Sequence, residues 1–205
     1  MIHQLAEGIA TYFLKENIIE QDDMDTYIYG AEVLISGALG IVNILLVSIL
    51  LDTFYQGILF LVIFIPIRMY TGGYHASSYF TCNIRFILVY ILSILVGDLI
   101  GKWNLTSLLW ILVLAGLLII FRYAPLENIN KKIPISKVKR YKVIGCSLYI
   151  AYMAIAIAMC VEMKQFEYIP VSVETGEYIN IILVTIVFLF VIGMRKEGKW
   201  NEKEN

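Results

Sequence analysis

Six long stretches without a charged residue constrain this chain more than any other feature of its sequence. They are Val33–Leu51, Thr53–Ile67, Phe86–Gly97, Trp103–Phe121, Val143–Val161 and Tyr178–Met194. A transmembrane helix needs about 20 mostly apolar residues, and the third stretch reaches that length if it tolerates Asp98. The second is short and contains Pro66, so we expect it to be tilted or kinked. None of the stretches alternates with a period of two, as a membrane β-strand would. The sequence therefore predicts an all-α, polytopic membrane protein with six transmembrane helices.

The composition excludes the soluble alternatives. Of the 205 residues, 60% are hydrophobic and 16% are charged, and the mean hydropathy is +0.77. Soluble domains have about 45–50% apolar and about 25% charged residues, and a 23.4 kDa chain has too little interior to bury this much apolar surface. The net charge of −1 argues against a nucleic-acid-binding protein.

The first 20 residues follow a different pattern. Apolar side chains recur at helical spacing from Ile2 to Phe13, and polar ones, including His3, occupy the other face. This pattern is typical of an amphipathic helix that lies on a membrane surface. We therefore predict one membrane domain over residues 1–205. It begins with an interfacial helix at 1–20, and it contains an inner segment at 68–83 and a basic cytoplasmic loop at 122–142. The six spans are expected at about 30–51, 54–69, 84–101, 104–121, 143–162 and 178–194.

The positive charges predict the orientation. With the N-terminus inside, 14 of the 16 Lys and Arg residues lie on the inner side, and only Lys102 and Lys164 lie outside. Cytoplasmic loops carry the excess of Lys and Arg. Six spans with both termini in the cytoplasm satisfy this rule.

Few residues could carry chemistry. The chain has two histidines and three cysteines, with no CxxC or HExxH pattern, so we expect no metal site and no cofactor. His3 is expected to be solvated on the polar face of the first helix. Cys146 and Cys160 lie within the fifth span and are expected to be packing residues.

His75 and Cys82 remain, in the inner segment between the second and third spans. A cysteine nucleophile needs a base within hydrogen-bond reach. On a continuous helix their spacing would separate them by about 10 Å, so the chain must fold back between them, and Gly72 and Gly73 supply flexible backbone just before His75. Cys82 would then lie near the first turn of the third span, where the helix N-terminus favours the thiolate. Taken alone, this pattern is better explained by an ordinary membrane-interface loop that holds one His and one Cys.

The string RMYTGGYHASSYFTC, from Arg68 to Cys82, resembles the hallmark of the accessory gene regulator B family. The resemblance extends to the amphipathic first helix, the YGAE sequence that ends at Glu32, the six spans, and the Ala-Pro-x-x-Asn-x-Asn-Lys stretch from Ala124 to Lys131. Members of this family are cysteine endopeptidases of the bacterial plasma membrane. They process a small pro-peptide into a cyclic autoinducing peptide for quorum sensing.

The resemblance implies that Cys82 is the nucleophile and His75 the general base, with Arg68 and Gly73 at motif positions required for activity. It also implies a homodimer and an amphipathic pro-peptide substrate with an acidic C-terminal tail. Three further residues are candidates for orienting the base or contacting substrate: Glu32, Asn83 and Arg85. Glu32 is equally well explained as a hydrogen-bonded helix–helix contact, because intramembrane acids are costly unless paired. Anionic lipid or an acidic substrate tail is the expected partner of five basic residues, Lys131, Lys132, Lys137, Lys139 and Arg140.

Two other classes of function remain open. One is a transporter or exporter of a small peptide, with Glu32 and Asp98 on its path. Against this reading, the predicted spans of this chain lack the paired broken helices that are typical of secondary transporters. The other is a membrane partner of a sensor kinase without catalytic activity.

Overall fold

The structure is a computed structural model, and it describes residues 2–72, 78–103, 105–126, 133–162 and 171–196. In these ranges the chain is helical and holds no strand. The helices are α1 (Ile2–Lys15), α2 (Met24–Leu50), α3 (Phe54–Thr71), α4 (Tyr79–Trp103), α5 (Thr106–Tyr123), α6 (Ile135–Glu162) and α7 (Val171–Lys196), with one 3₁₀ turn at Gln21–Asp23. Six of them, α2 to α7, are long and apolar enough to cross a membrane. The predicted all-α fold with six spans is confirmed.

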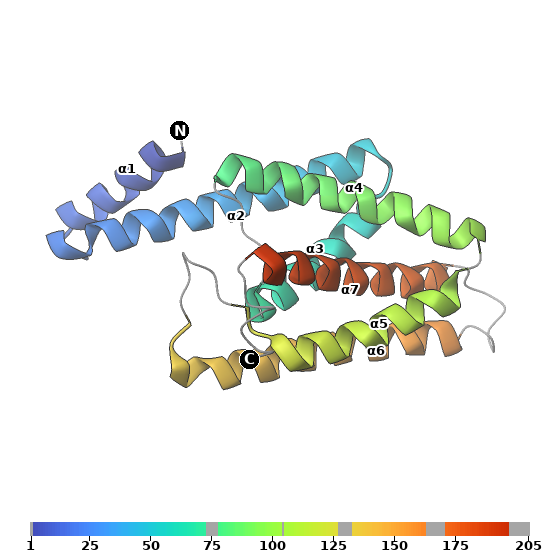
Figure 1. Cartoon of the computed structure of the whole chain (residues 1–205). Helices are drawn as coiled ribbons and strands as arrows, with labels where there is room; N and C mark the ends of the chain where they lie inside the picture. Colours follow the sequence, from blue (N-terminus) through green and yellow to red (C-terminus); the bar gives the residue numbers. More distant parts are fainter. Residues whose placement is uncertain (1, 73–77, 104, 127–132, 163–170, 197–205) are drawn as a thin grey trace.

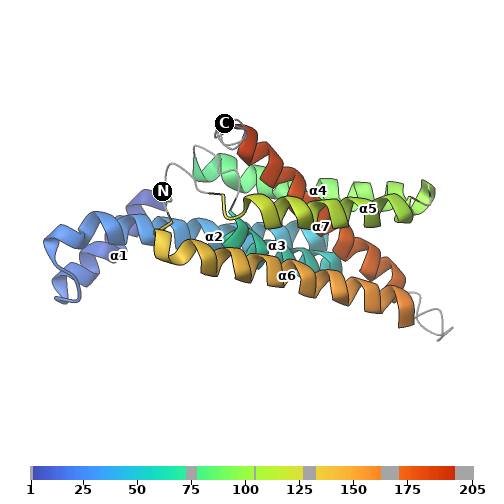
Figure 2. The same ribbon diagram turned by 60° about the horizontal axis from the view of Figure 1, so that its bottom comes forward.

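The six spans form two layers with two helices between them. Figure 1 shows α2 and α4 on one side and α5 and α6 on the other, with α7 between the two layers. Helix α3, which contains Pro66, crosses obliquely from the first layer to the second, as Figures 1 and 2 both show. Helix α7 packs on α3, α4, α5 and α6, so it is the central helix of the bundle.

The core gathers on α7, which is uncharged and mostly apolar from Tyr178 to Met194. Its fully buried side chains include Ile182, Leu183, Ile186 and Phe190. The outer helices instead leave large apolar side chains exposed, such as Leu50 at 83%. A helix that is hydrophobic all round and still exposed matches a lipid surrounding.

Polar side chains within the bundle pair between helices. Tyr90 bonds Thr53 at 2.7 Å, Ser93 bonds Tyr178 at 3.0 Å, and the Tyr149 hydroxyl donates to a backbone carbonyl of α5 at 3.0 Å. Such pairs compensate for the absence of water in the hydrocarbon region. They fix the helices in one arrangement.

Several helices begin earlier than predicted. Helix α4 begins at Tyr79 rather than at residue 84, and α6 begins at Ile135 rather than at residue 143. The stretch 135–142, expected as part of a basic loop, is therefore helical. Hydropathy marks where a helix enters the membrane, whereas charged residues such as Lys and Arg continue a helix readily outside it.

Helix α1 packs back along the first turns of α2 (Figure 1). Its contact face is made by the small side chains of Ala6 and Ala10, both fully buried. Leu5, Ile9 and Tyr12 on the neighbouring edge stay exposed. The expected amphipathic helix is present, with an apolar edge that α2 does not cover.

Candidate active site

The N-terminal end of α4 carries Cys82. The Ser78 hydroxyl accepts a hydrogen bond from the Thr81 amide at 3.2 Å, which caps the helix. The Cys82 amide donates to the Ser78 carbonyl at 3.0 Å, the first bond of the helical ladder. Cys82 therefore lies in the first turn, as predicted, and its thiol is free and exposed. The positive end of the helix dipole therefore lies next to this thiol.

Arg68 contributes a second positive charge. Its guanidinium interacts electrostatically with Cys82, although the two residues lie on different helices. The guanidinium also donates to the Gly72 carbonyl at 3.0 Å and lies over the Phe64 ring at 5.8 Å. Arg68 thus links the end of α3 electrostatically to Cys82 on α4.

Gly72 ends α3 in a conformation that only glycine adopts easily. Its φ is +75°, and a Cβ at this position would collide with the Leu126 carbonyl oxygen. The Leu126 amide donates to the Thr71 carbonyl at 2.8 Å, so the stretch after α5 lies directly against the chain that leaves α3. This contact anchors the start of the inner segment.

Glu32 and Asn83 hold α4 against its neighbours. The Glu32 carboxylate bonds His3 of α1 at 2.7 Å and accepts a bond from the Tyr79 hydroxyl at 3.0 Å. The Asn83 amide donates to the Ser36 hydroxyl at 3.1 Å. Of the two interpretations of Glu32, the structure shows the helix–helix contact. His3 is two-thirds exposed, but it is paired with Glu32 rather than simply solvated as expected.

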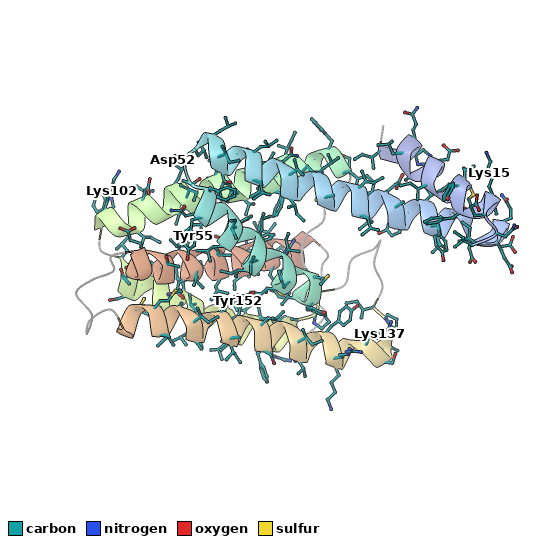
Figure 3. The ribbon with its side chains drawn as sticks, turned by 180° about the vertical axis from the view of Figure 1, so that it is seen from behind. Lys15, Asp52, Tyr55, Lys102, Lys137 and Tyr152 are labelled. Atoms are coloured by element: carbon teal, nitrogen blue, oxygen red, sulfur yellow. The ribbon has the colours of Figure 1, made fainter. Side chains whose placement is uncertain are left out.

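Three of the five basic candidates lie on the first turns of α6, at the same end of the bundle as Lys15 (Figure 3). Lys137 and Arg140 line a shallow pocket of about 210 Å³ together with Tyr70, Tyr141 and Ile144. The two tyrosine rings meet edge to face with their centroids 5.5 Å apart. Tyr70 lies two residues before Gly72, so this cationic pocket adjoins the inner segment. Lys139 does not line it.

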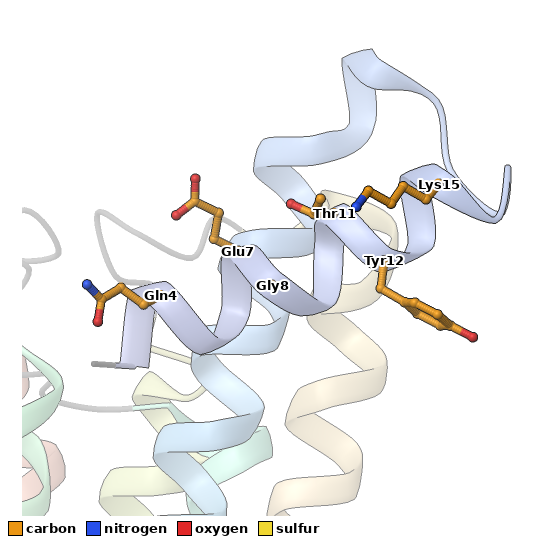
Figure 4. Close-up of a pocket in the computed structure, with 6 residues that line it drawn as sticks. All are labelled: Gln4, Glu7, Gly8, Thr11, Tyr12 and Lys15. Atoms are coloured by element: carbon orange, nitrogen blue, oxygen red, sulfur yellow. The ribbon is translucent and has the colours of Figure 1, made fainter.

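Another open depression lies on α1 alone. Gln4, Glu7, Thr11, Tyr12 and Lys15 line it, and Figure 4 shows their side chains directed outward from a single helix. Because one helix contributes every lining residue, this surface is the polar face of α1 rather than an enclosed site.

Several predicted site residues fall outside the described ranges, namely His75, Gly73, Lys131 and Lys132. Arg85 is described, one turn after Cys82 and exposed. Cys146 is buried and Cys160 partly buried within α6, as expected for packing residues. In the described ranges, no three His, Cys, Asp or Glu side chains gather closely enough to hold a metal ion.

Sequence reasoning missed Tyr79, Ser36 and the partnership of His3 with Glu32. A signal was present in the spacing. Glu32, Ser36 and Gly40 recur every four residues on α2, as Tyr79 and Asn83 do on α4, which places each set on one helix face.

These features define an integral membrane protein of six spans with an exposed, positively flanked cysteine at one end of the bundle. The sequence pattern of the Accessory gene regulator B family matches residues 6–194. The chain belongs to this family.

Individual relatives agree with that assignment. An AgrB-like protein of Clostridium perfringens strain SM101 is 23% identical over 201 residues, which cover 91% of this chain and 92% of the relative. Accessory gene regulator protein B of Staphylococcus aureus strain bovine RF122 is 27% identical over 171 residues, covering 82% of this chain and 89% of the relative. A second Clostridium perfringens protein, AgrB-like protein 2 of strain 13, is 26% identical over 148 residues and 68% of each chain. No solved structure matches.

Proposed function

We propose that the chain is a membrane-embedded cysteine endopeptidase. It removes the C-terminal tail of a small pro-peptide and enables cyclisation of the remaining core to a thiolactone or lactone autoinducing peptide. The observation that carries the proposal is the exposed thiol of Cys82 in the first turn of α4, together with its electrostatic interaction with the Arg68 guanidinium. Membership of the family supports the same function.

The proposed reaction has two acyl transfers. The Cys82 sulfur attacks a peptide carbonyl of the pro-peptide, and His75 accepts the thiol proton. His75 then protonates the amine of the departing tail as the C–N bond breaks, leaving a thioester on Cys82. In the second transfer, a thiol or hydroxyl of the substrate core attacks the thioester carbonyl. The C–S bond to Cys82 breaks, the proton returns to the enzyme, and the cyclic product is released.

The two steps differ in their energetics. Exchange of one thioester for another changes the free energy little, whereas conversion of an amide to a thioester raises it. Removal of the tail or of the cyclic product must therefore shift the equilibrium toward cyclisation. Water must also be kept from the thioester, and a site at the end of a transmembrane helix, next to apolar walls, suits this requirement.

The location and partners follow from the same proposal. The protein lies in the bacterial plasma membrane with both termini in the cytoplasm, where an unexported pro-peptide is available. The substrate's acidic tail contacts the basic residues at the start of α6, which also touch anionic lipid. For a homodimer, Gly37 on α2 is available, since nothing lies within 4 Å of a Cβ built there, whereas Gly40 already packs against Asn83 and Phe86.

The test is cleavage of the pro-peptide encoded next to the gene, co-expressed with the full chain and followed by mass spectrometry. We expect loss of cleavage in Cys82→Ala and in His75→Ala, with Cys160→Ala as a matched cysteine control that retains it. Cleavage that persists in both active-site variants would refute the peptidase.

The transporter alternative finds less support in the structure. Glu32 is engaged with His3 and Tyr79 at one end of the bundle, and Asp98 is exposed near the opposite end of α4. Export that continues while Cys82→Ala abolishes cleavage would show that two activities share the chain.

A further inference from the structure

The carboxylate of Glu32 joins three helices at one point. One oxygen meets Nδ1 of His3 on α1 at 2.7 Å, and the other accepts the Tyr79 hydroxyl of α4 at 3.0 Å. The Glu32 side chain is only 16% exposed, compared with 67% for His3. Tyr79 is half-buried, whereas His3 is exposed. Water therefore competes less for the Tyr79 contact than for the His3 contact, since hydrogen bonds are stronger in shielded surroundings.

A second contact repeats the first one turn further along. Asn83 follows Tyr79 by four residues, and its amide donates to Ser36, which follows Glu32 by four residues. The same amide also donates to the Tyr79 carbonyl at 3.0 Å. On the next turn of α2, a Cβ at Gly40 would lie 3.0 Å from the Asn83 Oδ1, so the two helices approach closely here. Two successive turns of α2 are thus hydrogen-bonded to two successive turns of α4.

Cys82 lies between these two contacts in sequence. Its own side chain is exposed and takes part in neither. Two contacts on one face of α4, at Tyr79 and Asn83, fix the rotation of the first turn about the helix axis. That rotation sets the direction in which the Cys82 Cβ–Sγ bond points.

Assuming the peptidase function proposed above, we propose that Glu32 is a positioning residue for Cys82. Glu32 holds the first turn of α4 through Tyr79, and it couples this turn to α1 through His3. Helix α1 is thereby a structural part of the active site. Misplacement of a reacting group by about 1 Å costs about a hundredfold in rate, so loosening this junction lowers kcat while KM for the pro-peptide stays nearly constant.

The test combines kinetics with hydrogen exchange of the full chain in detergent micelles. The variants are Tyr79→Phe, Glu32→Gln and His3→Gln, and the matched controls are Tyr55→Phe at the far end of α3 and Glu7→Gln on the exposed face of α1. We expect the amides of the first turn of α4 to exchange faster in Tyr79→Phe and Glu32→Gln. These two variants also lose about tenfold or more in kcat, and His3→Gln loses less because its side chain is largely solvated.

The double variant Glu32→Gln/Tyr79→Phe distinguishes positioning from two separate defects. One shared contact predicts a combined loss no larger than that of the more damaging single variant. Additive losses, or lowered kcat with unchanged exchange in the first turn of α4, would overturn the inference. If the wild-type chain cleaves no pro-peptide but exchange responds as expected, the peptidase function fails while the Glu32 junction stands.

Discussion

The amide of Leu126 donates a hydrogen bond to the carbonyl of Thr71 at 2.8 Å, although 55 positions separate the two residues in the chain. The contact brings the stretch after α5 against the end of α3, within the inner segment that carries the family motif. It leaves no room for a side chain at Gly72.

Gly72→Ala should destabilise the protein and abolish cleavage. The glycine has φ +75° and ψ −159°, a region of backbone space that costs other residues about 1–3 kcal/mol, and the new Cβ would also collide with the Leu126 carbonyl. Thermal unfolding in detergent micelles and a cleavage assay measure the two effects. Gly101→Ala is the control, because nothing lies within 4 Å of its Cβ. Equal stability of the two variants would contradict this account of the turn.

Cys82 should react with a small maleimide well ahead of Cys146. The first thiol is exposed in the first turn of α4, whereas Cys146 is 8% exposed within the bundle. Mass spectrometry of digested protein, after graded exposure in micelles, reports the order of labelling. Cys146 should react only after the protein is unfolded, and early labelling of Cys146 would show that α6 packs differently.

Lys137→Gln combined with Arg140→Gln should weaken processing of an acidic-tailed pro-peptide. Both side chains are exposed, and each exposed charge pair contributes about 0.2–1 kcal/mol. The double variant should therefore lose about two- to thirtyfold in kcat/KM. A pro-peptide with a neutral tail should be affected little.

Lys139→Gln is the matched control for this double variant, because Lys139 carries the same charge on the same helix but does not line the pocket with Tyr70 and Tyr141. Equal losses in kcat/KM for pro-peptides with acidic and neutral tails would show that Lys137 and Arg140 set the membrane orientation of the protein or bind lipid, rather than contact the tail.

Single cysteines at Lys15 and Lys102 should report opposite sides of the membrane. Figure 3 shows the two residues at opposite ends of the bundle. In a background with the native cysteines replaced by alanine, a membrane-impermeant thiol reagent added to intact cells should label position 102 and spare position 15. The reverse result would invert the proposed orientation and place Cys82 outside.

Much of the candidate site could be predicted from sequence. The position of Cys82 near the first turn of α4 could be predicted from where the third apolar stretch begins, which is a local feature. The electrostatic contact of Arg68 with Cys82 could not be predicted this way, because the two residues meet only when α3 and α4 are placed. The role of Glu32 was undecided for the same reason, since its partners His3 and Tyr79 lie 29 and 47 positions away.

The amino-acid sequence was enough to predict the membrane class, the number of spans, their orientation and the pair of residues proposed for catalysis. Hydropathy and charge placement depend on the solvent surrounding each segment, and the bilayer provides that solvent without reference to the rest of the fold. The helix packing was needed to show that α7 is the central helix, that Glu32 connects α1 to α4, and that Leu126 lies against Gly72. All spans are similarly apolar, so their mutual arrangement depends on close packing at small residues and on a few interhelical hydrogen bonds. Those contacts join residues far apart in the chain, and no local pattern encodes them.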